Sequence, residues 1–243
     1  MRAAGNHTSL ERRVVLPELL DSLPADDPEA VRSRRDLRRL IVLIRHPFHL
    51  ANALRDLLPA GRRPRLADIG AGDGCVTLNV ARRLRKRSGP AEITLVDRKP
   101  AVDVNVAMQF AKLHWRARIV QADAFAWLDS RDSSADVISV NLFLHHLSDA
   151  DLRALFERLA AVTRAFAALE PRRSPFSLFL SRCVRLAGCG RVTAHDAPVS
   201  VRAGFTGREL SALWPRLPGW QLCEQQVGLF SHLFIAQQTS LAE

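Results

Sequence analysis

Short apolar runs alternate with helix-length segments through the middle of the chain, between residues 65 and 170. Such alternation predicts strand–helix–strand units, and therefore a largely parallel sheet covered by helices. A serine with a carboxylate three positions later, Ser148 and Asp151, predicts the start of one of these helices. The expected strands are 66–69, 93–97, 117–120, 135–140 and 165–169, and the expected helices are 76–87, 100–115 and 149–163.

The flanking segments have other patterns. Residues 1–60 carry apolar positions at helical spacing and are expected to form a helical layer on the core, without a motif that gives them a role. Residues 171–204 place prolines and glycines around an apolar patch and predict a lid over a pocket. Residues 205–243 predict a helix after Thr206 and a closing strand pair hinged near Gly228. The chain thus divides into 1–60, a core at 61–170, the lid at 171–204, and 205–243, which completes the core.

Composition restricts the class of protein. With 243 residues, 47% of them hydrophobic, the chain is expected to fold as one elaborated globular domain. The longest apolar runs are too short for a membrane span, and the start of the chain lacks the apolar region of a signal peptide. The four cysteines form no C-x-x-C pair, which favours a reduced, cytoplasmic protein and gives no reason to expect a metal.

The net charge of +10 is a weaker indication than it looks. Of the 35 basic residues 32 are arginine, and they are spread along the whole chain. A nucleic-acid surface would concentrate basic residues on one face with interleaved aromatic side chains. The dispersion therefore argues against a nucleic-acid partner.

A glycine-rich turn after the first predicted strand is the strongest motif. Residues 67–74 read Ala-Asp-Ile-Gly-Ala-Gly-Asp-Gly and lie between a strand and a helix. Glycine allows a tight turn and the close approach of a ligand. The spacing differs from the G-x-G-x-x-G that holds a pyrophosphate, and Asp68 and Asp73 would repel phosphate. The turn therefore favours a ligand that carries a cationic amine and a sulfonium.

Two further aspartates follow the next two strands. Asp97 ends the second strand, where a carboxylate can accept hydrogen bonds from both hydroxyls of a ribose. Asp123 follows the third strand and could accept from an adenine amino group, although a position before a helix also suits a capping residue. Three acidic residues at successive strand ends predict one nucleoside site.

These residues, with Asn141-Leu142-Phe143-Leu144-His145-His146 after the fourth strand, resemble class I S-adenosylmethionine-dependent methyltransferases. The resemblance implies an α/β, Rossmann-like sheet that is mostly parallel, with seven strands and an antiparallel last strand. It implies S-adenosylmethionine as the cofactor, with the glycine turn at its methionine end and Asp97 on its ribose. It places Asp123 and Ala124 on adenine, and Asn141 and Leu142 near the reacting methyl. The implied cofactor-binding residues are Asp68, Gly70, Gly72, Gly74, Asp97, Asp123, Ala124, Asn141 and Leu142.

A second, less specific similarity concerns residues 192–196 and 200–205. They resemble bacterial small-molecule methyltransferases of polyketide and quinone pathways. The hypothesis is methyl transfer to a small, apolar, phenolic or quinol-type metabolite of secondary metabolism, on oxygen or, as a close variant, on carbon. An RNA methyltransferase and a cofactor-binding partner protein without turnover are the alternatives. The oligomeric state is left open.

Histidine is the natural base for a hydroxyl nucleophile, because its unperturbed pKa lies near neutrality. His145 and His146 follow the fourth strand, and His195 lies in the predicted lid beside Asp196, a neighbour not expected to point the same way. These three are the candidate catalytic residues, although one of the His145–His146 pair could instead cap a turn or pack. Candidate acceptor-binding residues are Arg202, Phe176 and Phe179.

Overall fold

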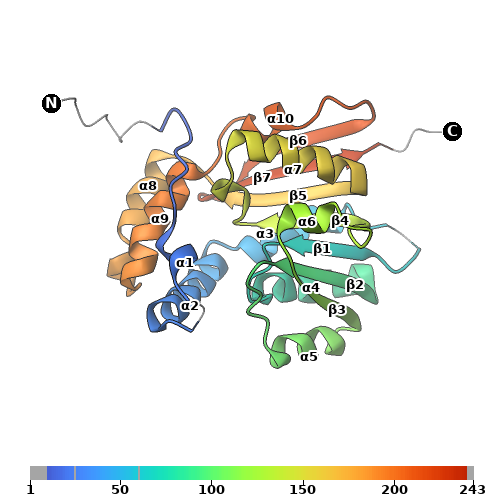
Figure 1. Ribbon diagram of the computed structural model, residues 1–243, viewed down its shortest axis with the longest axis horizontal. Coiled ribbons are helices and arrows are strands. Elements are labelled where there is room, and N and C mark those ends of the chain that lie inside the picture. The colour runs from blue at the N-terminus through green and yellow to red at the C-terminus, as the bar shows by residue number, and fades with distance from the viewer. Residues whose placement is uncertain (1–9, 25, 60, 240–243) are drawn as a thin grey trace.

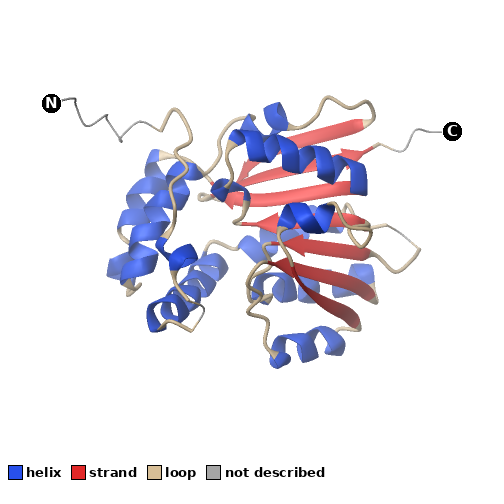
Figure 2. Cartoon of the chain, in the orientation of Figure 1, coloured by secondary structure: helices blue, strands red, loops and turns tan. Residues whose placement is uncertain are grey.

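One sheet runs through the molecule (Figure 2). It has seven strands in the order β3–β2–β1–β4–β5–β7–β6. The computed structural model describes residues 10–24, 26–59 and 61–239. Strands β1 to β5 are parallel, and β7 is antiparallel to both β5 and β6. The expected sheet and its antiparallel last strand are thereby confirmed. The strands are β1 (Arg65–Ile69), β2 (Ala91–Asp97), β3 (Trp115–Gln121), β4 (Ala135–Asn141), β5 (Thr163–Pro171), β6 (Trp220–Val227) and β7 (Ser231–Gln238).

Helices cover both faces of the sheet and bury one apolar cluster on each. On one face, α6, α7 and α10 pack over side chains such as Phe156, Phe166 and Phe234. On the other, α3, α4 and α5 pack over side chains such as Leu95 and Leu169. Burial on both faces explains why the central strands are near-continuous apolar runs. These helices are α3 (His46–Arg55), α4 (Cys75–Ser88), α5 (Val104–Lys112), α6 (Ala124–Leu128), α7 (Asp149–Val162) and α10 (Glu209–Leu213).

The remaining helices form a group beyond the carboxyl ends of the parallel strands (Figure 1). In this group α9 packs against α1, α2 and α8, so that the N-terminal residues and the 171–204 segment form one unit. The helices are α1 (Leu19–Ser22), α2 (Pro28–Leu43), α8 (Pro175–Arg182) and α9 (Arg191–Ala203), with 3-10 turns η2 (Val184–Ala187) before α9 and η1 (Leu144–His146) after β4. None of the helices in the described ranges is both long enough and apolar enough to span a membrane.

Local signals placed most element boundaries correctly. Ser148 accepts a hydrogen bond from the Asp151 backbone N–H at 3.1 Å and begins α7, as predicted. The helix expected from residue 100 instead begins at Val104, because the Asp103 carboxylate caps it by accepting from the Val106 N–H. The strand pair around Gly228 is also present, and the four cysteines are free thiols.

Candidate functional site

The glycine turn joins β1 to α4 in a conformation that favours glycine. Gly70, Gly72 and Gly74 have φ of 75°, 56° and 72°, in the left-handed region. The Gly70 N–H donates to the Val96 carbonyl at 2.8 Å, which fixes the turn against β2. A Cβ at Gly70 would lie 2.7 Å from the Phe143 ring, whereas one at Gly72 would meet nothing within 4 Å. Gly70 thus permits the β4 loop to approach the turn.

Asp97, at the end of β2, organises the loops beside this turn. Its Oδ2 accepts from the Gly72 N–H at 2.8 Å, and its Oδ1 accepts from the Lys99 N–H at 2.7 Å. Each carboxylate oxygen can accept a second hydrogen bond. The carboxylate therefore holds the loop and still has acceptor capacity for a ligand hydroxyl.

Asp68, within β1, is buried on the face covered by α4. It accepts hydrogen bonds from the hydroxyls of Thr77 and Ser139. Burial raises the pKa of Asp68 to about 6, although the two hydroxyl donors oppose the shift. A cation placed beside this carboxylate would favour its charged form.

Asp123 serves as the N-cap of α6, accepting from the backbone N–H groups of Phe125 and Ala126. The capping role considered from the sequence is therefore present. Asp123 and Ala124 also line a cavity, so that capping does not remove them from a ligand site.

This cavity, of about 620 Å³, lies at the carboxyl ends of β1, β2 and β4. Such edges are where open α/β sheets bind ligands. Of the residues expected at the cofactor, Gly70, Asp97, Asp123, Ala124 and Leu142 line it, whereas Asp68, Gly72, Gly74 and Asn141 are not among its described lining residues. The other lining residues are Val15, Leu16, Pro17, Asp21, Ile69, Val96, Arg98, Ala122, Phe125, Phe143, His146 and Leu147.

The cavity is covered by the N-terminal segment (residues 10–22), which corrects the prediction of a lid at 171–204. Val15, Leu16 and Pro17 form part of its wall, whereas none of the described lining residues comes from 171–204. The sequence was misleading because the prolines and glycines of 171–204 delimit two helices that pack on each other, α8 and α9. The N-terminal segment contains no sequence motif from which its position at the cavity could be predicted.

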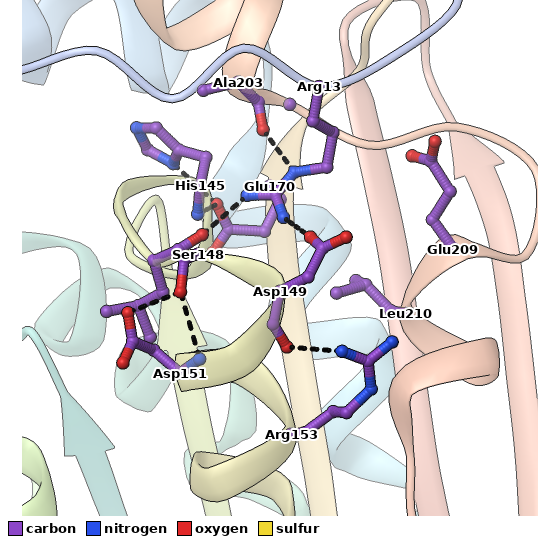
Figure 3. Close-up of polar contacts among 12 residues, drawn as sticks. Arg13, His145, Ser148, Asp149, Asp151, Arg153, Glu170, Ala203, Glu209 and Leu210 are labelled. Atoms are coloured by element: carbon purple, nitrogen blue, oxygen red, sulfur yellow. Dashed lines mark hydrogen bonds and ion pairs between the residues drawn. The ribbon is translucent and has the colours of Figure 1, made fainter.

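Arg13 fastens this segment at three points (Figure 3). Its guanidinium donates to the Ala203 carbonyl at 2.9 Å, to the Leu147 carbonyl at 3.0 Å and to Asp149 at 2.7 Å. It also lies 4.1 Å from the centroid of the Phe205 ring. Arg13 thus joins the segment to the end of α9 and the start of α7.

A second set of anchors comes from α9. The Asp196 carboxylate accepts from the backbone N–H groups of Leu19 and Leu20, at 2.9 and 3.0 Å, where α1 begins. The Ser200 hydroxyl donates to Glu18. The role of α9 is therefore to hold the cover, and not to form it.

His145 is buried between two carboxylates. Its Nδ1 lies 2.7 Å from Glu170 on β5, and its Nε2 lies 3.5 Å from Glu18. Burial alone would lower the pKa of His145, but the hydrogen bonds to Glu170 and Glu18 outweigh it and raise the pKa to about 9. The imidazole is therefore protonated at neutral pH and does not line the cavity, which excludes it as a base there.

His146 faces the cavity. Its Nδ1 lies 3.5 Å from the Asp21 carboxylate, and both residues belong to the cavity wall. Burial and the adjacent positive charge of His145 lower the pKa of His146 below its usual value. A neutral imidazole at the cavity wall has the properties that a proton acceptor requires.

The other predicted catalytic and acceptor-binding residues lie elsewhere. His195 is on α9 with its side chain 48% exposed, and contrary to expectation its Nδ1 contacts Asp196 at 2.8 Å. Phe176 stacks on Phe230, and Phe179 is exposed. Arg202 donates to the Pro198 carbonyl within α9. His195 and Arg202 on α9, and Phe176 and Phe179 on α8, are thus absent from the described lining of the cavity, and their roles stay predictions.

Two features at the end of β4 escaped sequence reasoning. Leu142 has φ of 55°, an uncommon conformation for a non-glycine residue that places it in the cavity wall. Beside it, the His46 Nδ1 lies 2.7 Å from the Asn141 Oδ1. Burial lowers the pKa of His46 to about 4, so this imidazole is neutral and fixes Asn141 through a donated hydrogen bond. Only the fold brings α3 to this position.

Among the described residues, Glu18, His145 and His146 form one group whose potential metal-ligand atoms lie within 4.8 Å of one another. The sequence could not reveal this group, because Glu18 is remote from the two histidines along the chain. The contacts of His145 with both carboxylates already satisfy its two ring nitrogens. The absence of a metal therefore stays a prediction.

Comparisons with known proteins agree with this geometry. Residues 66–165 match the family described as "Methyltransferase domain". This part of the chain is therefore similar to a methyltransferase domain. Its residues include the glycine turn, Asp97 and Asp123, and they end in β5, so the flanking helices and the covering segment lie outside the match. No curated protein matches the chain at a significant level.

Solved structures of low sequence identity share the fold of this chain. One is a possible exported protein of Bordetella parapertussis, with a TM-score of 0.59 and 17% identity over 88% of this chain and 70% of that one. A putative O-methyltransferase of Nostoc punctiforme has a TM-score of 0.58 and 15% identity, over 91% and 64%. The plantazolicin methyltransferase BamL, solved with S-adenosylhomocysteine and a substrate analogue, has a TM-score of 0.58 and 16% identity, over 90% and 92%. They establish the fold as that of class I methyltransferases.

Proposed function

We propose that the protein transfers a methyl group from S-adenosylmethionine to a hydroxyl of a small, apolar acceptor of phenolic or quinol type. The observation that carries the proposal is the composition of the cavity. Asp97 and Asp123 line it beside the glycine turn, and apolar side chains line it together with His146 and Asp21. The first group of residues suits a nucleoside, and the second group suits an apolar molecule with one ionisable group.

The first group of lining residues fits S-adenosylmethionine. Carboxylates lining the cavity accept hydrogen bonds from hydroxyl and amino groups and attract a sulfonium, whereas a pyrophosphate would be repelled. Arg98 is the one arginine or lysine among the described lining residues. Asp97 would hold the ribose hydroxyls, Asp123 and Ala124 the adenine, and Gly70 and Leu142 the portion near the methyl. Asp68 does not line the cavity, because its carboxylate accepts hydrogen bonds from Thr77 and Ser139. It would affect cofactor binding indirectly, by fixing the position of the glycine turn.

The second group of residues would define the acceptor. Val15, Leu16 and Pro17 of the N-terminal segment line the same cavity as the apolar side chains of Phe143 and Leu147. Burial of an aromatic acceptor against these groups would exclude water from the reacting atoms. An acceptor carbon activated by an adjacent hydroxyl would occupy the same place, so that C-methylation is a close variant.

The protein contributes position and proton transfer, while the cofactor supplies the activated methyl carbon. Displacement at that carbon requires the acceptor oxygen in line with the breaking carbon–sulfur bond, and the residues that line the cavity would hold the acceptor in this position. His146 takes the acceptor proton as the new carbon–oxygen bond forms, and Asp21 stabilises the resulting imidazolium. A pathway of secondary metabolism is consistent with such an acceptor and with the name of another structure of this fold, the pyocyanin biosynthetic protein PhzM.

Calorimetry with S-adenosylhomocysteine, followed by methyl-transfer assays on a panel of phenols and quinols, tests the proposal. Saturable binding and turnover of at least one phenol are expected. Absence of S-adenosylhomocysteine binding would refute the cofactor assignment. Binding without turnover on the panel would favour a cofactor-binding partner protein, and turnover on RNA alone would favour an RNA methyltransferase.

A further inference from the structure

A second cavity lies apart from the cofactor cavity, between α2 and the turn that precedes α9. It has a volume of about 470 Å³ and shares none of its described lining residues with the larger cavity. Volumes of this size accommodate small organic ligands. Three arginines of α2 give the cavity a positive charge. The lining residues are Pro28, Val31, Arg32, Arg35, Asp36, Arg39 and Gly188.

The three arginines lie on one side of α2 because their spacing follows the helical period. Arg32, Arg35 and Arg39 are three and four positions apart, and all three are exposed at the cavity. Like charges at this spacing repel one another when no anion lies between them. The positive charges at the cavity therefore destabilise the protein when no ligand is bound.

Arg32 is held in place by the opposite wall. Its Nη2 lies 3.4 Å from the Gly188 carbonyl, and a Cβ at Gly190 would come within 2.9 Å of its Nε. The close approach of backbone and guanidinium is possible only because Gly190 has no side chain. Arg32 thus forms a fixed edge of the cavity.

The other two arginines have no hydrogen-bond or ion-pair partner within the described ranges of the chain. The acidic residue in the cavity wall, Asp36, is buried and turned to α9, where it accepts from the Gly190 N–H at 2.7 Å and from the Thr193 hydroxyl at 3.4 Å. Arg35 and Arg39 therefore keep their donors for a ligand.

We propose that this cavity binds a phosphorylated small molecule, with its phosphate between Arg35 and Arg39 and its apolar portion against Val31 and Pro28. Guanidinium groups pair with phosphate through two parallel hydrogen bonds. Three arginines and one carboxylate leave two net positive charges, which match a phosphate dianion better than a carboxylate. The walls contributed by Val31 and Pro28 account for a ligand larger than phosphate itself.

Calorimetry with 1-naphthyl phosphate tests this, on protein saturated with S-adenosylhomocysteine to fill the cofactor cavity. We compare R35Q/R39Q with R83Q/R87Q, a pair that removes the same charge from exposed positions four residues apart on α4. Site binding predicts at least a tenfold weaker affinity in R35Q/R39Q and less than a twofold change in R83Q/R87Q. Inorganic phosphate should bind more weakly than naphthyl phosphate, and at the same site.

Equal losses in the two double variants would overturn the proposal, because they would show attraction by net charge alone. Absence of saturable binding to the wild-type protein would overturn it as well. Thermal melting and S-adenosylhomocysteine affinity, expected to be unchanged in both variants, show whether each variant is folded. The proposal does not depend on methyl transfer, so its failure leaves the proposed function intact.

Discussion

Glu18 and His145 lie far apart in the chain, yet the Glu18 Oε1 is 3.5 Å from the His145 Nε2 in the interior of the protein. The contact joins the covering N-terminal segment to the loop after β4, and Glu170 completes it from the other side of the ring. A buried imidazolium between two carboxylates is strongly destabilised when one partner is removed. The cover of the cavity and the protonation of His145 are therefore linked.

Stability should fall as pH rises above about 6.5. The pKa of His145 is raised to about 9 in the folded protein, so its contribution is complete below the unfolded pKa and is lost as pH rises through the folded value. The full effect amounts to about 3 kcal/mol in the free energy of unfolding between pH 6 and 9. Urea denaturation at several pH values measures it. The variant E18Q should show a smaller pH dependence, and an equal slope in E18Q would contradict the role of Glu18.

Gly70→Ala should impair the protein more than Gly72→Ala. Both residues have positive φ, which costs each alanine variant about 1 kcal/mol. Only at Gly70 would the new Cβ meet the Phe143 ring, so its total loss should reach about 2–3 kcal/mol, with displacement of the β4 loop. Thermal melting and S-adenosylhomocysteine calorimetry compare the two variants. Equal behaviour would show that the contact with Phe143 is unimportant.

Asp97→Asn should weaken S-adenosylhomocysteine binding by at least tenfold. The amide keeps an acceptor oxygen for only one of the two backbone N–H groups of the adjacent loops, and it removes the charge that strengthens hydrogen bonds from ribose hydroxyls. Calorimetry gives the affinity, and circular dichroism checks the fold. Asp103→Asn, which changes the cap of α5 outside the cavity, is the matched control and should retain affinity.

His146→Asn should lower kcat by about a hundredfold or more at saturating cofactor, because it removes the proton acceptor at the cavity. The decline of the wild-type rate at low pH should also disappear in this variant, since protonation of His146 causes it. His195→Asn is the control, because that side chain is outside the cavity wall. If both variants keep the wild-type pH profile, proton transfer by histidine is refuted.

Asp196→Asn should loosen the cover of the cavity. The carboxylate accepts hydrogen bonds from two backbone N–H groups at the start of α1. The amide has one acceptor oxygen and can keep only one of these hydrogen bonds. We expect faster dissociation of S-adenosylhomocysteine, measured by stopped-flow fluorescence, with little change in melting temperature. Limited proteolysis should cut the variant earlier in residues 10–22. Unchanged rates of dissociation and cleavage would exclude this anchoring role.

The sheet, and the placement of Asp97 and Asp123 at one edge of it, followed from local sequence. Apolar runs buried on both faces specify parallel strands, and a glycine turn can adopt its left-handed φ only with residues such as those at 70, 72 and 74. Asp97 and Asp123 follow directly from their positions at strand ends, because parallel strands bring these ends to one edge. The closing antiparallel pair was also readable from its strand lengths and from Gly228.

Tertiary structure alone decided which histidine faces the cavity and which segment of the chain covers it. Whether His145 or His146 faces the cavity depends on the Glu170 and Glu18 carboxylates, which come from β5 and from the start of α1. The identity of the covering segment depends on Arg13 and Asp196, whose partners are mostly backbone groups that any sequence would offer. Contacts between residues that are far apart in the chain produce no periodic pattern or motif in the sequence, so they cannot be predicted from it. The sequence therefore determined which edge of the sheet carries Asp97 and Asp123, and only the folded chain determined which segment lies over this edge and which imidazole faces the cavity.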